Sequence, residues 1–211
     1  MALALTSAER TRKEKFFSKI ICKQEIELFK SIDSSSLSFE NFVWLAWSIK
    51  ESVYKFCSRN NSSLLFSPTK IFINSIQLPA KKNIPIGREM ESGSLDRAIS
   101  YCCEVSFQGS KYFTQSIINN ELIFSVCNNK NDFDNICWGI KNIHDDRYEN
   151  QSASVRLFTL NKLQDLFKHS DLKIEKKTAG YPVIKQRPNI PLSFTHHGCF
   201  VGYAFALNSN E

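Results

Sequence analysis

Hydrophobic residues recur at helical spacing between Ser38 and Arg59, in the segment SFENFVWLAWSIKESVYKFCSR. At about 100° per residue, one stripe of this segment follows the i, i+3, i+4, i+7 pattern of a core-facing helix surface. The stripe consists of Phe42, Leu45, Ala46, Ile49, Val53 and Phe56. Ser38 is suited to cap such a helix, because a serine hydroxyl can accept a hydrogen bond from the first turn. The pattern predicts one long helix over 38–59, around which we expect the rest of the chain to be organised.

The opposite face of this helix differs from the solvated face of an ordinary amphipathic helix. It carries Trp44, Trp47, Glu51, Tyr54, Lys55 and Ser58. Large aromatic residues favour burial of this face too, and a charge held there must be paired or bound to something. An i, i+4 salt bridge between Glu51 and Lys55 at the rim of the helix explains the same pattern equally well.

The remaining pattern predicts a mixture of short helices and strands. Residues 7–31 are typical of two short helices, the first capped by Thr6 or Ser7, and 66–79 predict a strand. Residues 79–98 mix Pro, Gly and charge, which predicts a loop or link. Three β-rich runs over 101–127, separated by Gly-Ser and Asn-Asn, predict an antiparallel meander. Residues 128–151 are polar, and 152–169 predict a second helix docked on the sheet.

The C-terminal segment, 172–207, predicts a strand, a Gly-Pro turn, a second strand, a Pro break and two closing strands about His196 and His197. The closing strands are nearly continuous in apolar residues, so we expect them to be central. The sequence has no internal repeat, no βαβ rhythm and no glycine-rich phosphate loop. We therefore predict an α+β fold with an antiparallel sheet packed against a long central helix. We expect one domain over 1–211, with a β-rich insertion at about 99–150.

Composition adds a modest electrostatic preference. The chain is 42% hydrophobic and 23% charged, as expected for a globular protein, and its net charge is +6. The positive excess is not concentrated in a tail and is not interleaved with aromatics. An anionic small molecule or an acidic protein is therefore a better partner than nucleic acid.

The seven cysteines form no C-x-x-C pair and mostly lie in apolar runs. This pattern predicts reduced, buried cysteines of a cytoplasmic protein. The N-terminal apolar run is too short for a signal peptide, and no segment approaches a membrane span.

Two places combine residues suited to chemistry. The first is Lys50 and Glu51 with Lys55 one turn later, where a carboxylate could hold Mg²⁺ on a polyphosphate or deprotonate a hydroxyl while lysine neutralises phosphate oxygens. The second is SFTHHG, 193–198, where a histidine could donate to a phosphate or be satisfied by backbone carbonyls. A zinc site is disfavoured there, because adjacent side chains on a strand point to opposite faces.

A basic group near the N-terminus has two interpretations. It consists of Arg10, Arg12, Lys13 and Lys15. These residues form either a solvated helix face or a phosphate clamp near the long helix.

Three segments together resemble the 4'-phosphopantetheinyl transferase superfamily. WSIKESVYK, 47–55, is similar to its W-x-x-K-E-[AS]-x-x-K signature, GYP, 180–182, to its G-[KR]-P turn, and PLSFTHHG, 191–198, to its [IL]-S-x-S-H-x-G strand end. The order of the three motifs is that of the holo-acyl carrier protein synthase type, whereas the chain length is closer to that of the larger members. The sequence WLAWSIKES around the first motif resembles the type seen in Bacteroidetes.

The resemblance implies transfer of phosphopantetheine from coenzyme A to a serine of an acyl carrier protein in fatty acid, polyketide or peptide synthesis. By motif position, Glu51 would bind Mg²⁺ and help to activate the serine, and Lys55 would contact the pyrophosphate with Lys50 nearby. Thr195 and His196 would bind the adenosine phosphate. Arg12, which lies in no family motif, is a further candidate contact to coenzyme A from the basic group near the N-terminus. Coenzyme A is then the substrate and Mg²⁺ the cofactor.

The sequence departs from the family pattern in two ways. No Asp precedes Asp33, although members begin with a G-x-D strand whose Asp is a second metal ligand, and Tyr181 replaces a basic residue. We therefore expect the start to be truncated. The alternatives are a catalytically impaired relative that binds coenzyme A or a carrier protein, and a basic interaction module without small-molecule chemistry.

Overall fold

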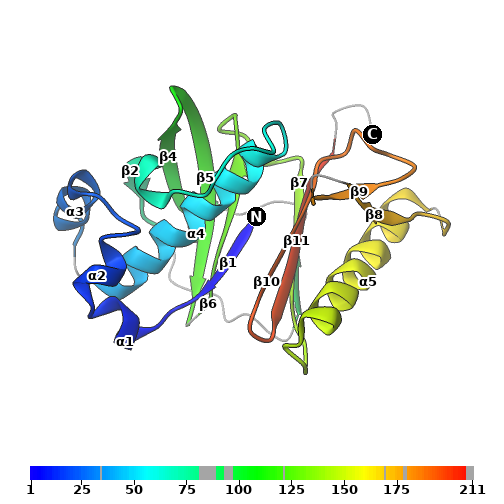
Figure 1. The fold of residues 1–211 in the computed structure, drawn as a ribbon, viewed down its shortest axis with the longest axis horizontal. Helices are drawn as coiled ribbons and strands as arrows, with labels where there is room; N and C mark the ends of the chain where they lie inside the picture. The colour runs from blue at the N-terminus through cyan, green and yellow to red at the C-terminus, as the bar shows by residue number, and fades with distance from the viewer. Residues whose placement is uncertain are drawn as a thin grey trace. The chain divides into compact units, whose positions relative to one another are not determined.

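A computed structural model describes residues 1–33, 35–80, 89–92, 97–120, 122–168, 170–177 and 180–207, with 89–92 described by backbone alone. The chain divides into two compact units (Figure 1). The N-terminal unit comprises Ala2–Pro85 and Asp96–Asp132, and the C-terminal unit comprises Met1, Ile86–Leu95 and Phe133–Glu211. Strands and helices occur in both, which confirms the predicted α+β class.

The N-terminal unit is built on a five-stranded antiparallel sheet in the order β1-β6-β5-β4-β2. The strands are β1 (Ala2–Leu5), β2 (Phe72–Gln77), β4 (Tyr101–Phe107), β5 (Ser110–Asn119) and β6 (Leu122–Asn128). The predicted strand at 66–79 and the predicted meander over 101–127 are thus confirmed. The 3-10 turns Pro68–Lys70 (η1) and Arg97–Ile99 (η2) precede β2 and β4.

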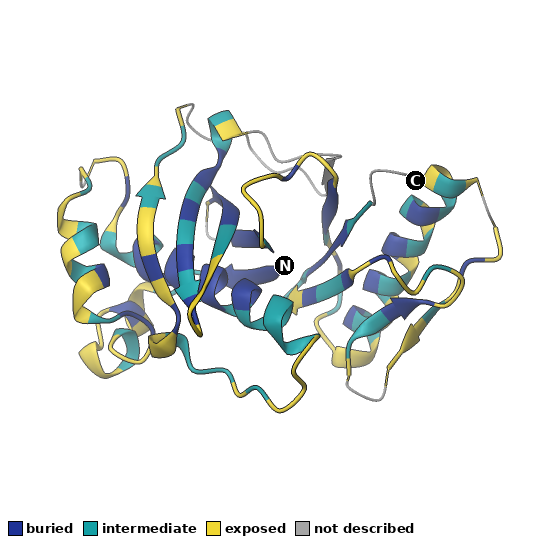
Figure 2. Ribbon diagram, turned by 90° about the horizontal axis from the view of Figure 1, so that it is seen from above, coloured by how far each residue is buried: buried dark blue, intermediate teal, exposed yellow. Residues whose placement is uncertain are grey.

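One long helix, α4 (Phe39–Ser58), packs on this sheet, mainly on β6 and β1. Ser38 caps it, its hydroxyl accepting from the backbone N–H of Asn41 at 3.2 Å. The predicted stripe lies in the core, with Ala46, Ile49 and Val53 fully buried, and Figure 2 shows the buried colour along the helix and adjoining strands. The Ser48 hydroxyl also donates to the Ala2 carbonyl at 3.3 Å, which ties α4 to the first strand. The prediction of a long helix over 38–59 is therefore confirmed.

Buried and partly exposed residues alternate along β4, and the buried ones pack into the same core. Every second residue of β4, from Tyr101 to Phe107, is buried, as expected for a strand with one face on a helix. Gln108 and Gly109 form a two-residue turn into β5, both with positive φ (+49° and +76°). Glycine tolerates this conformation freely, whereas glutamine adopts it at some cost.

Three short helices, rather than the predicted two, precede α4. They are α1 (Ala8–Thr11), α2 (Glu14–Phe17) and α3 (Lys23–Lys30). The Ser7 hydroxyl accepts from the Arg10 N–H at 3.4 Å, so the predicted cap is confirmed. The chain breaks again after Arg12, since the next helix starts from an extended Lys13.

The C-terminal unit contains a four-stranded antiparallel sheet in the order β10-β11-β7-β3. Its strands are β3 (Glu89–Ser92), β7 (Ile136–Asn142), β10 (Leu192–His197) and β11 (Phe200–Ala206). Helix α5 (Tyr148–Phe167) packs on β11 and β10, as predicted, and a hairpin joins β8 (Ile174–Lys176) to β9 (Pro182–Ile184).

Two sequence predictions need correction here, and one strand lies in a segment for which no element was predicted. The segment 79–98, predicted to be a loop or link, contains strand β3, and the polar segment 128–151 contains strand β7. Of the two closing strands, β11 is central but β10 lies at the edge of the described sheet. Strand pairing supplied by distant segments outweighs local composition in these cases. The segment predicted to be an insertion, at about 99–150, contains strands β4 to β7. Of these, β4, β5 and β6 belong to the N-terminal unit and β7 belongs to the C-terminal unit.

All seven cysteines are free, as the sequence predicted, but only Cys103, Cys127 and Cys137 are buried and the other four are partly exposed. Burial raises the pKa of the Cys103 and Cys127 thiols well above its ordinary value, which keeps them protonated and unreactive. In the part of the chain that the structure describes, no helix is long and apolar enough to cross a membrane.

Candidate active site

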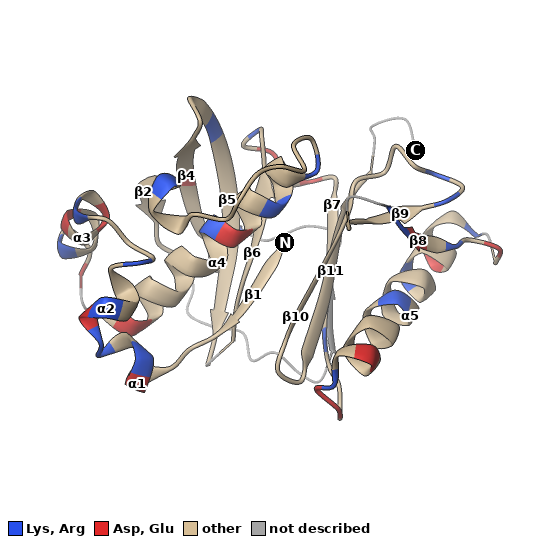
Figure 3. Cartoon of the chain, viewed as in Figure 1, with Lys and Arg blue, Asp and Glu red and all other residues tan. Residues whose placement is uncertain are grey.

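Glu51 and Lys55 lie one turn apart on α4, with their side chains partly exposed. Lys55 Nζ is 2.9 Å from Glu51 Oε1, and the two side chains are 28% and 22% exposed. Figure 3 shows red and blue patches side by side on this helix. The carboxylate and the ammonium therefore remain within reach of a ligand while they hold each other in place.

Lys50, the neighbour of Glu51 in sequence, points into the interior. Its ammonium donates to Glu25 Oε2 at 2.6 Å and to the Ile20 carbonyl at 2.7 Å, and the side chains of Lys50 and Glu25 are both 0% exposed. Burial lowers the pKa of Lys50, and the nearby Glu25 carboxylate opposes this shift only in part. The structure does not bring Lys50 together with Glu51 and Lys55. Its predicted contact with coenzyme A stays a prediction, which this geometry does not favour.

Glu25 is the residue that sequence reasoning missed. Its second carboxylate oxygen accepts from the Ile73 N–H at 2.9 Å, and Oε2 also accepts from the Cys22 N–H at 2.9 Å. One carboxylate thus joins α3, α4 and β2. The sequence did hold one signal for Glu25, which follows Cys22 by three residues, the spacing of a helix capping box. The motif is hard to recognise because its first residue is usually Ser or Thr and here is Cys.

The aromatic residues beside Glu51 are covered by segments on either side of α4. Trp44 Nε1 donates to the Thr11 hydroxyl at 3.0 Å, and the Trp44 ring lies 5.3 Å from that of Phe16. Trp47 and Tyr54 both contact Phe66, with ring centroids 5.3 and 5.1 Å apart. The second face of α4 is therefore substantially covered by protein, and Glu51 and Lys55 lie at its partly open end.

Arg12 is exposed at the C-terminal end of α1, next to the buried Thr11. Because Thr11 hydrogen-bonds Trp44, this end of α1 is attached to α4. Lys13, in the same basic group, pairs with Glu9 at 2.9 Å in an exposed salt bridge. Arg12 is thus accessible within the N-terminal unit, and its predicted role stays a prediction.

The other predicted binding residues belong to the C-terminal unit, on β10. Thr195 pairs with Gly202 of β11 and is buried, whereas His196 is exposed, as the alternation of a strand requires. A Cβ on Gly202 would lie 3.3 Å from Thr195 Cγ2 and 3.1 Å from the Gly139 carbonyl oxygen, so the strands approach closely here. The structure therefore places these two side chains on opposite faces of β10.

His196 is held by contacts from α5. Its ring meets that of Tyr148 edge-on, with centroids 5.7 Å apart. Gln151 Nε2 donates to the Gly198 carbonyl at 2.9 Å, which fixes the turn after the strand. The exposed imidazole is therefore presented from an ordered hairpin end.

The Gly-Tyr-Pro segment forms the β8–β9 turn, as predicted. Gly180 has φ +93°, a conformation that disfavours other residues, and its N–H donates to the Lys177 carbonyl at 2.8 Å. Lys177 N–H in turn donates to the Tyr181 carbonyl at 3.0 Å.

Mg²⁺ was expected at Glu51. Within the described residues, no group of three or more His, Cys, Asp or Glu side chains could hold a metal ion. Mg²⁺ in phosphate chemistry, however, is commonly held by one or two carboxylates, with substrate phosphates and water completing the shell. A single accessible carboxylate beside a lysine fits that mode of binding.

Comparison with known proteins agrees with the motif analysis. The model of the 4'-phosphopantetheinyl transferase superfamily matches residues 4–104, which include α1 to α4 and thus Glu51, Lys55, Lys50 and Arg12. Searches of curated proteins and of solved structures found no match. The family match supports phosphopantetheinyl transferase chemistry in general. The resemblance deduced from the sequence is thereby confirmed for residues 4–104, somewhat less than half of the chain, which are similar to the 4'-phosphopantetheinyl transferase superfamily.

Proposed function

We propose that this protein transfers the 4'-phosphopantetheine group from coenzyme A to a serine hydroxyl of an acyl carrier protein. The observation that carries the proposal is the partly exposed Glu51–Lys55 pair on α4, inside the span that matches the family. The Glu51 carboxylate can accept a proton or bind a cation. The Lys55 ammonium, 2.9 Å away, can bind a phosphate.

In the proposed reaction, the serine oxygen attacks the phosphorus that carries pantetheine. A new P–O bond forms to serine, and the P–O bond to the second phosphate breaks, releasing 3',5'-adenosine bisphosphate. Glu51 helps to take up the serine proton, and Lys55 neutralises negative charge on the pyrophosphate oxygens. Catalysis then consists mostly of positioning and charge stabilisation.

Mg²⁺, when bound, would be held by Glu51 and would neutralise charge on the transferring phosphate. Thr195, His196 and Arg12 are proposed to contact coenzyme A, His196 and Arg12 through their exposed side chains. The net charge of +6 suits both an anionic substrate and an acidic carrier protein.

The test is incubation of the protein with Mg²⁺, coenzyme A and an apo-acyl carrier protein, followed by mass spectrometry of the carrier. We expect one phosphopantetheine to be added. Glu51→Gln should lower the rate by about a hundredfold or more, the order of loss when a proton-transfer group is removed. Glu40→Gln, at the start of the same helix, is the matched control and should retain activity.

Unchanged transfer by Glu51→Gln, with the fold intact by circular dichroism, would remove Glu51 from the mechanism. Calorimetric titration with coenzyme A separates the alternatives. Binding without transfer identifies a catalytically impaired relative, and absence of binding favours a basic interaction module.

A further inference from the structure

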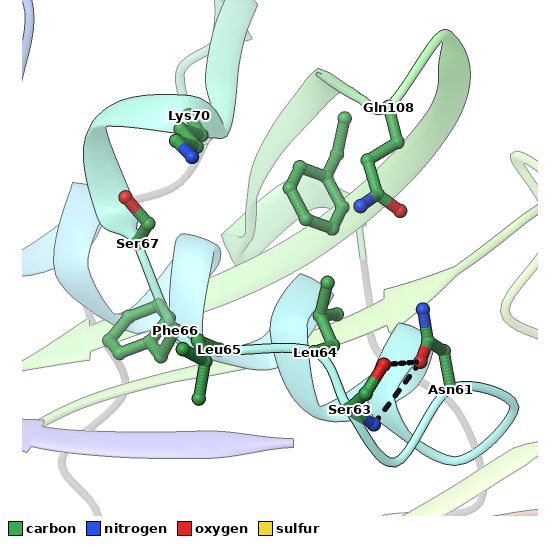
Figure 4. A pocket seen from close by; sticks show the side chains of 9 residues that line it. Asn61, Ser63, Leu64, Leu65, Phe66, Ser67, Lys70 and Gln108 are labelled. Carbon is green, nitrogen blue, oxygen red and sulfur yellow. Dashed lines mark hydrogen bonds between the residues drawn. The ribbon is translucent and has the colours of Figure 1, made fainter.

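A cavity of about 800 Å³ lies in the N-terminal unit beyond the C-terminal end of α4 (Figure 4). Its walls come from the segment after α4, from η1 and from the β4–β5 turn. The volume is within the range of small-molecule sites. Nothing in the proposed transfer reaction uses it.

The polar side chains at this cavity are neutral except for one cation. They are Asn61, Ser63, Ser67, Lys70 and Gln108, and the residues that line the cavity include no Asp or Glu. Asn61 Oδ1 accepts from the Ser63 N–H at 3.2 Å and from its hydroxyl at 2.7 Å. Because a backbone N–H cannot bond to an amide NH₂, this contact fixes the orientation of Asn61 and leaves its NH₂ available to donate.

Lys70 supplies the cationic group. Its side chain is exposed, and among the described residues no carboxylate lies within salt-bridge distance of it. Some other lysines of this unit are paired with a carboxylate, as Lys13 is with Glu9 and Lys30 with Glu27. An ammonium beside amide and hydroxyl donors, without a carboxylate, matches a carboxylate or phosphate group of a ligand.

The remaining wall is apolar and firmly held. Phe66 packs on Trp47 and Tyr54, and the Tyr54 hydroxyl donates to the Leu64 carbonyl at 3.3 Å, so this segment is tied to α4. Phe107, at the end of β4, is buried. Leu65 is 84% exposed at the rim, where it is accessible to the apolar part of a ligand.

Gln108 enters the cavity from the strained turn described above, with φ +49°. Figure 4 shows its amide facing the same space as Lys70 and Leu64. The turn sets the direction in which the Gln108 side chain leaves the backbone, which places one more polar group at this cavity.

We propose that this cavity binds a small amphipathic anion, with its carboxylate or phosphate at Lys70 and its apolar body on Leu64, Leu65, Phe66 and Phe107. None of the residues that line this cavity is among those proposed to bind coenzyme A, and the proposal does not depend on transferase activity. Acyl carboxylates and alkyl phosphates share the required chemistry.

The test is calorimetric titration of the full chain with decanoate, decyl phosphate and, as the cationic counterpart, decyltrimethylammonium. We expect one equivalent of an anionic probe to bind and the cationic one not to bind. The ratio of the two anion affinities tells which head group the site prefers. Equal binding of the cation, or no binding of either anion, would overturn the proposal.

Variants test the assigned contacts. Lys70→Gln should weaken anion binding about tenfold, and Lys70→Arg should restore it, since either cation can pair with the head group. Lys130→Gln, another exposed lysine of the same unit, is the matched control and should bind normally. Unaltered affinity in Lys70→Gln, or displacement of the probe by equimolar coenzyme A, would refute a separate anion site at Lys70.

Discussion

Helix α4 contributes to two carboxylate–lysine pairs, Glu25–Lys50 and Glu51–Lys55, which differ in burial and in their further hydrogen bonds. The Glu25–Lys50 pair has no exposed surface, a separation of 2.6 Å and further hydrogen bonds to the Ile20 carbonyl and to two backbone N–H groups. The Glu51–Lys55 pair is partly exposed, with the partners one turn apart at 2.9 Å. Lys50 and Glu51 are neighbours in sequence, yet Lys50 belongs to a buried salt bridge and Glu51 is a partly exposed candidate catalytic group.

The difference shows what each pair can do. A buried charge has lost its water and depends on its partner, so removing one member leaves the other stranded. A partly exposed pair gains little stability, because water screens it, but each member can exchange its partner for a ligand. We infer that Glu25 and Lys50 fix α4 against α3 and β2, while Glu51 and Lys55 stay partly exposed and accessible to a ligand.

The largest expected effect is on stability. Lys50→Met should lower the free energy of unfolding by about 3–5 kcal/mol, because the buried Glu25 carboxylate loses its cation. Lys55→Met, the control on the same helix, should cost about 1 kcal/mol or less. Urea unfolding followed by circular dichroism measures both. Equal losses in the two variants would erase the distinction between the pairs.

A smaller net effect is expected when both buried charges are removed. Glu25→Leu combined with Lys50→Met should be more stable than either single variant, and within about 2 kcal/mol of the unmodified chain, because no charge is stranded. The remaining loss comes from the N–H groups of Cys22 and Ile73, which lose their acceptor. A double-mutant cycle with urea unfolding quantifies the coupling. Strictly additive losses would mean that the pair acts as two independent residues.

The smallest effect is a pH dependence. The pKa of Lys50 is lowered from 10.5 in the folded chain, so between its folded and unfolded values the unfolded chain holds the proton more tightly. The contribution of Lys50 to the free energy of unfolding should therefore rise as the pH increases towards 10.5, and fall as the pH drops through the folded value. The difference in unfolding free energy between the unmodified chain and the double variant isolates this contribution, since both share the other lysines. A difference that declines with rising pH would contradict the direction of the shift.

Local pattern predicted the elements whose faces are strongly amphipathic. The 3.6-residue spacing from Phe42 to Val53 gave α4 and its buried stripe, and Ser38 marked its start. The alternation from Tyr101 to Phe107 gave β4, and the family motif gave Glu51 and Lys55 as candidates. By contrast, β7 was hidden in a polar segment, because its strand character comes from pairing with β11 and β3.

The sequence by itself determined the long helix, the meander and the motif residues, since each depends on spacing within a short segment. Only the tertiary structure decided which lysine of the Lys50-Glu51-Lys55 group is internal, because that depends on a carboxylate 25 residues away. It also placed Gln108 and Lys70, from segments far apart in the sequence, at one cavity (Figure 4). A helical or strand period carries no information about charge partners that are distant in sequence, so pairs such as Glu25–Lys50 are decided by the tertiary structure alone.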